Sequence, residues 1–141
     1  AVMEAGFHGV HNFPSMGMLD GPFRSTMKQN HMSFSHEVRF MERAVLRDIF
    51  TFAMVFNSTE AIQMRDAGVH SITLAPSVSL LNQKDGLKLY LEECEHILQL
   101  LPEDRLFFCC WPNQTASTDL AYLLHNSHRK FNGFYSSAIP A

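Results

Sequence analysis

Residues 6–21 read GFHGVHNFPSMGMLDG, and this stretch says more about the fold than any other part of the chain. Residues 7–13 are largely apolar and can form a strand, which Pro14 ends. Gly17 and Gly21 then break the chain into a long loop. The loop is neither a Walker A sequence nor a GxGxxG fingerprint, so it does not predict a dinucleotide-binding or P-loop site.

The rest of the chain alternates between apolar strands and amphipathic helices. Further strands are predicted at residues 50–56, 69–75, 106–111 and 131–136. Helices are predicted at residues 23–31, 35–49 with Ser35 as N-cap, 57–68, 87–101, and after Ser117 or Thr118. In the third of these, Asn57 and Glu60 have the spacing of a capping pair. Residues 77–86 are predicted to form a polar loop.

Strands that alternate with helices indicate parallel βαβ units. The chain has 141 residues and no linker or low-complexity segment, so we predict one α/β domain over residues 1–141. Five parallel strands fit either an open doubly wound sheet or an incomplete barrel, and periodicity does not choose between them.

A family resemblance favours the barrel. Residues 6–21, with Phe23 and Arg24 close behind, resemble the motif GFxGVQNFPTVGxIDGxFR of the phosphoenolpyruvate-hydrolase-like proteins, also called predicted TIM-barrel signal-transduction proteins. Shorter matches follow at Glu37-Val38, Phe56 with Glu60-Ala61, Ala67-Gly68 and Gly133-Phe134-Tyr135. Family members carry three further βα units before this motif. The resemblance therefore implies that residues 1–141 are strands four to eight of a TIM (β/α)₈ barrel, a partial domain.

The sequence departs from the family pattern after the last three strands. Residues 75–82 read APSVSLLN where the family has HMGLTTGG, and residues 110–114 read CWPNQ where it has CHGGP. The eighth strand is followed by Ala138-Ile139-Pro140 in place of MERLP. Glycines let a ligand approach the backbone closely, and proline removes an N–H donor. We therefore expect an anion site on these loops to be weakened, with the fold retained.

The loop after the first strand keeps the family pattern best, and active sites of barrels lie at the carboxyl ends of strands. The predicted catalytic residues are His11, Asp20 and Arg24, and the predicted ligand-binding residues are Asn12, Ser136 and Ser137. His11 replaces the family glutamine. The structural alternative is that Asn12 and Asp20 bond loop backbone, that Arg24 pairs with Asp20, and that Glu37 only favours its helix dipole.

The resemblance implies chemistry on a small phosphorylated or carboxylated metabolite, of the hydrolase or lyase type on a phosphoenolpyruvate-like molecule. The alternative is a non-catalytic domain for small-molecule sensing or assembly within a larger protein. No metal ligand set is predicted; His125 and His128 have i, i+3 spacing but no further ligand nearby. The cofactor stays open, and a divalent metal is compatible with the chemistry.

Composition limits the partners. A net charge of −3 gives no reason to expect binding to nucleic acid or to anionic membranes, and no apolar run reaches the length of a membrane span. Three cysteines, two of them adjacent, do not suggest a disulfide framework, so we predict a cytoplasmic, reducing compartment. An open parallel edge strand would need a cover, which predicts a homo-oligomer or a longer chain.

Overall fold

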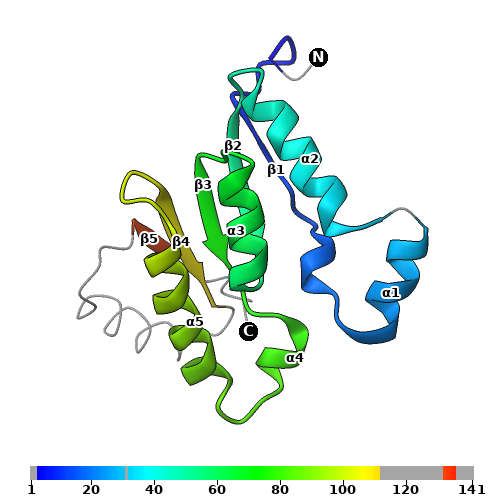
Figure 1. The fold of residues 1–141 in the computed structure, drawn as a ribbon, viewed down its shortest axis with the longest axis vertical. Helices are drawn as coiled ribbons and strands as arrows, with labels where there is room; N and C mark the ends of the chain where they lie inside the picture. Colours follow the sequence, from blue (N-terminus) through cyan, green and yellow to red (C-terminus); the bar gives the residue numbers. More distant parts are fainter. Residues whose placement is uncertain (1–2, 31, 112–131, 136–141) are drawn as a thin grey trace, which may run out of the picture.

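A computed structural model describes residues 3–30, 32–111 and 132–135. Its five strands form one parallel sheet in the order in which they occur along the chain: β1 Gly9–His11, β2 Phe50–Val55, β3 Ser71–Leu74, β4 Leu106–Cys110 and β5 Gly133–Tyr135 (Figure 1). A doubly wound sheet reverses its strand order at a switch point, whereas this order runs in one direction only. The fold is therefore the α/β arrangement of a partial TIM barrel, as the resemblance implied.

Helices cover one face of this sheet. The helices are α1 Gly21–Gln29, α2 Phe34–Val45, α3 Ser58–Asp66, α4 Val78–Leu81 and α5 Gly86–Leu100, with a 3₁₀ turn η1 at Met16–Met18. Strand residues Val55, Ile72 and Cys109 are fully buried in one core cluster with Met64 and Cys94 of the helices. This cluster places α2, α3 and α5 on the same side of the strands (Figure 1).

The opposite face of the sheet carries an aromatic row and is only partly covered. Phe52 alternates with the core residues of β2, so its ring lies on this second face. Its centroid is 4.8 Å from the His11 ring and 6.0 Å from the Phe108 ring. Phe50 is 43% exposed and Leu106 is 37% exposed. In a closed barrel, side chains on this face would fill the interior.

Several helix boundaries in the structure differ from those predicted from the sequence. The N-cap of α2 is Ser33, so the prediction of Ser35 was wrong, and the helix ends at Val45, four residues before Ile49. Asp48, with φ 54°, turns the chain there. Residues 78–81, predicted within a loop, form α4 because Ser77 Oγ accepts the Leu80 N–H and begins a turn. The predicted helix after Ser117 or Thr118 lies outside the described residues.

Candidate functional site

Residues 12–33, between β1 and α2, form a long segment that we call the strap. It contains η1 and α1 and folds back over the carboxyl ends of the neighbouring strands. Met18 of the strap packs against a small buried cluster of Met54, Phe56 and Ala75, at the ends of β2 and β3. The strap therefore lies at the edge of the sheet where barrels place their active sites.

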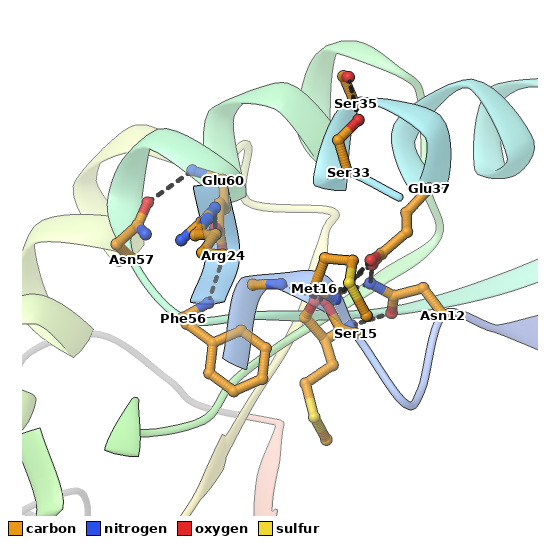
Figure 2. Close-up of polar contacts among 12 residues, drawn as sticks. Asn12, Ser15, Met16, Arg24, Ser33, Ser35, Glu37, Phe56, Asn57 and Glu60 are labelled. Carbon is orange, nitrogen blue, oxygen red and sulfur yellow. Dashed lines mark hydrogen bonds and ion pairs between the residues drawn. The ribbon is translucent and has the colours of Figure 1, made fainter. Parts of the chain in front are cut away.

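The first attachment of the strap is the carboxylate of Glu37, in the first turn of α2. It accepts hydrogen bonds from Asn12 Nδ2 at 2.8 Å, Ser15 Oγ at 2.7 Å and the Met16 N–H at 2.6 Å (Figure 2). Asn12 is buried, and its amide also exchanges two hydrogen bonds with the backbone of Met54. The structure thus gives Glu37 a specific partner set, beyond the dipole role expected from its position.

The second attachment is Glu60, which is only 3% exposed. Its Oε1 accepts from Arg24 Nη2 at 2.7 Å, and its Oε2 accepts from the Phe56 N–H at 2.9 Å (Figure 2). The Asn57 side chain caps α3 by accepting the Glu60 N–H at 2.9 Å, which confirms the predicted cap. Arg24 pairs with Glu60, so the alternative that paired it with Asp20 was wrong.

Gly17 is required by the close approach of the strap to Glu60. A Cβ at position 17 would lie 2.6 Å from Glu60 Oε2 and 2.6 Å from Cδ2 of Phe56. Neither neighbour is free to move, because Glu60 holds two hydrogen bonds and Phe56 is buried. Close packing therefore explains why a glycine occupies this position of the family-like motif.

Asp20 joins the strap to the loop after β3. Its Oδ2 accepts from Ser79 Oγ at 2.8 Å and from the Ser79 N–H at 3.4 Å. Both residues are exposed, so a carboxylate remains accessible here. Asp20 occupies the N-cap position of α1 but makes no side-chain cap bond there.

His11 ends β1 on the aromatic face. Its ring packs against Phe52 and stacks on Phe13, with centroids 6.1 Å apart and planes 17° from parallel. Although the residue is exposed overall, this packing buries part of the imidazole. Burial lowers the pKa of His11 below its ordinary value, which favours the neutral ring at neutral pH.

The predicted catalytic residues thus have separate partners. Among the described residues, no hydrogen bond or ion pair joins His11, Asp20 and Arg24 to one another. Ser136 and Ser137 lie outside the described residues. Within the described ranges, no group of three or more His, Cys, Asp or Glu side chains could hold a metal ion. None of the helices described there is long and apolar enough to cross a membrane.

Comparison with known proteins identifies the family of the chain. The family model for phosphoenolpyruvate hydrolase-like proteins matches residues 1–139. The chain belongs to this family. It is 28% identical over 144 residues to two Solanum lycopersicum proteins, the ToMV resistance protein Tm-1(GCR237) and the ToMV susceptible protein tm-1(GCR26). The match covers 96% of the chain but only 19% of each relative, so this phosphoenolpyruvate hydrolase-like chain spans about a fifth of their length.

Sequence reasoning missed two residues that shape this site. Glu37 and Glu60 were noted for their places at helix starts and in family-like segments, yet they bond strap residues 21 and 36 positions away, respectively. The available signal was indirect: both are carboxylates beside strand ends in segments that resemble the family. Lys28, which lines a cavity together with Arg24, was also missed.

Proposed function

We propose that the chain binds a small phosphorylated or carboxylated metabolite at the carboxyl edge of its sheet. The observation that carries this proposal is the strap, because two carboxylates fix a polar loop at the edge where parallel barrels bind their ligands. A site whose backbone is held in advance binds without the cost of ordering a loop. Membership of the family supports this class of ligand.

Each predicted residue has a proposed role. Arg24 binds the anionic group, because a guanidinium offers several donors in one plane. Asp20 and the neutral imidazole of His11 are the candidate bases for chemistry on a carbon–oxygen or carbon–carbon bond. Asn12 acts through the strap, since its amide is already engaged by Glu37 and Met54. Ser136 and Ser137 are proposed as further hydroxyl donors to the anion.

The second candidate is a non-catalytic domain for sensing or assembly within a larger protein. The partly exposed aromatic face favours it, because such a face needs a cover in the assembled protein. A homo-oligomer or the rest of a longer chain could supply that cover. A signalling role and a cytoplasmic location belong to this same proposal. The described residues offer no complete metal site, so we assign no step to a divalent metal.

The test uses the protein at its full natural length. Phosphoenolpyruvate binding is measured by calorimetry, and hydrolysis is followed by phosphate release with and without Mg²⁺ or Mn²⁺. We expect binding, with turnover that falls at least about tenfold in the His11→Ala and Asp20→Ala variants. Lys84→Ala, at an exposed loop position, is the matched control. Binding without turnover would support the sensor, and absence of both would refute the metabolite site.

A further inference from the structure

A cavity of about 360 Å³ opens between α1 and the first turns of α2 and α3. Its lining includes Arg24 and Lys28 of α1, Ser33 and Ser35 at the start of α2, and Thr59 and Gln63 of α3. The charged lining residues are these two cations and Glu60, so two positive charges minus one negative charge leave a net charge of +1. A cavity of this size can hold a small metabolite.

Glu60 holds Arg24 in place beside this cavity and leaves some of its N–H donors free. One terminal nitrogen donates to Glu60, and 38% of the arginine side chain remains exposed. Both oxygens of Glu60 are already occupied, by Arg24 and by the Phe56 N–H. The carboxylate therefore orients the guanidinium without using its remaining N–H donors. A guanidinium with free donors matches the oxygens of phosphate and carboxylate groups.

Lys28 lies one helical turn after Arg24 and lines the same cavity. Its side-chain ammonium makes no hydrogen bond or ion pair within the part of the chain that the structure describes. Hydroxyl groups complete the polar wall: Ser33 Oγ lies 2.8 Å from Ser35 Oγ and 2.8 Å from His36 Nδ1. Figure 2 shows these serines across from Arg24, at the start of their helix.

We propose that this cavity binds a phosphate group, with Arg24 and Lys28 as its two cationic contacts and Glu60 as the residue that positions Arg24. Two cations of different geometry suit a phosphate, because arginine fixes its orientation and lysine supplies a mobile point charge. The inference rests on the proposed function for the class of metabolite, and it names where the anionic group of that metabolite is held.

The experiment titrates the full-length protein with inorganic phosphate and, separately, with phosphoenolpyruvate, using calorimetry and amide NMR shifts. Lys28→Gln is the main variant, because the Lys28 ammonium has no partner among the described residues and its loss leaves the strap attached. We expect Lys28→Gln to weaken phosphate binding several-fold and Arg24→Gln to weaken it about tenfold or more. Lys84→Gln should bind as the unmodified protein does. A sulfate titration shows whether the site accepts any tetrahedral anion.

The outcomes separate the two proposals. Unchanged phosphate affinity in folded Lys28→Gln and Arg24→Gln would overturn the phosphate site, and so would shifts confined to residues outside the cavity. If phosphoenolpyruvate were bound and turned over equally by both variants, the proposed function would stand and this inference would fail. If phosphate bound through Arg24 and Lys28 while phosphoenolpyruvate neither bound nor reacted, the inference would stand and the proposed function would fail.

Discussion

Two loops at the carboxyl edge of the sheet are built in opposite ways. The strap after β1 is tied to α2 and α3 by the carboxylates of Glu37 and Glu60, which accept five hydrogen bonds in all. The loop after β3 is short, contains α4, and is held by serine hydroxyls that are mostly exposed. The first loop resembles its family motif closely, and the second departs from it.

The comparison of these two loops shows which residues cannot be replaced singly, because each depends on a contact with another residue. In the strap, replacing Asn12, Gly17 or Arg24 would leave a carboxylate without its donor or force a clash with Glu60. In the loop after β3, the serines bond one another and the Leu80 N–H, and the one distant contact is the exposed bond from Ser79 to Asp20. Family-like sequence at the strap is therefore accounted for by packing and hydrogen bonding as much as by chemistry.

The largest expected effect comes from Glu60→Ala. It removes both hydrogen bonds of a buried carboxylate and leaves the Phe56 N–H without its acceptor. We expect the free energy of unfolding in urea to fall by about 3 kcal/mol. Glu92→Ala, in an exposed pair with Lys88, is the control and should change stability by less than about 1 kcal/mol. Equal losses in the two variants would mean that the strap is not tied through Glu60.

Next in size is Gly17→Ala, because the new methyl group would meet Glu60 and Phe56. We expect a loss of about 2 kcal/mol from overpacking. In a Glu60→Ala background one of the two contacts is gone, so the added cost of the alanine should shrink. A double-mutant cycle in urea measures this coupling. Additive losses would contradict the close approach of Gly17 to Glu60.

Much of the fold could be predicted from the sequence, because strand and helix periodicities are local properties of the chain. The Asn57 cap is also local, and it was predicted correctly. The attachments of the strap could not be predicted in this way, since Met16 and Glu37 are 21 residues apart and Arg24 and Glu60 are 36 apart. Such contacts depend on how the strap folds back, which no single segment encodes. The observed end of α2 also differs from the predicted end. Ile49 continues the apolar spacing of the helix but follows the turn at Asp48.

Glu37→Gln tests the first attachment with a nearly equal volume. A glutamine has one acceptor oxygen, whereas both oxygens of Glu37 accept hydrogen bonds from strap residues. We expect a loss of about 1–2 kcal/mol in unfolding free energy. Glu42→Gln, exposed on the same helix, is the matched control. If Glu37→Gln were as mild as this control, neither the second acceptor oxygen nor the charge of Glu37 would be needed to attach the strap.

Ser79→Ala removes the hydroxyl that donates to Asp20. It therefore tests whether the loop after β3 restrains the strap. Because both residues are exposed, we expect a stability change below about 1 kcal/mol and faster amide hydrogen exchange in the strap near Asp20. Ser79→Thr keeps the hydroxyl and should exchange as the unmodified protein does. Unchanged exchange in Ser79→Ala would show that the loop after β3 does not restrain the strap.

The smallest effect concerns His11, which lies where the strap leaves the aromatic face. Burial by neighbouring rings lowers the pKa of His11 below 6.5, so an NMR titration should find it below that value. The folded state then binds the proton less tightly than the unfolded chain does. Stability should therefore fall slightly as pH drops through 6.5 toward the folded pKa, and level off below it. Phe52→Ala uncovers the ring and should raise the pKa of His11, whereas Phe40→Ala on α2 should not. An unchanged pKa in Phe52→Ala would show that the aromatic face does not shield His11 from water.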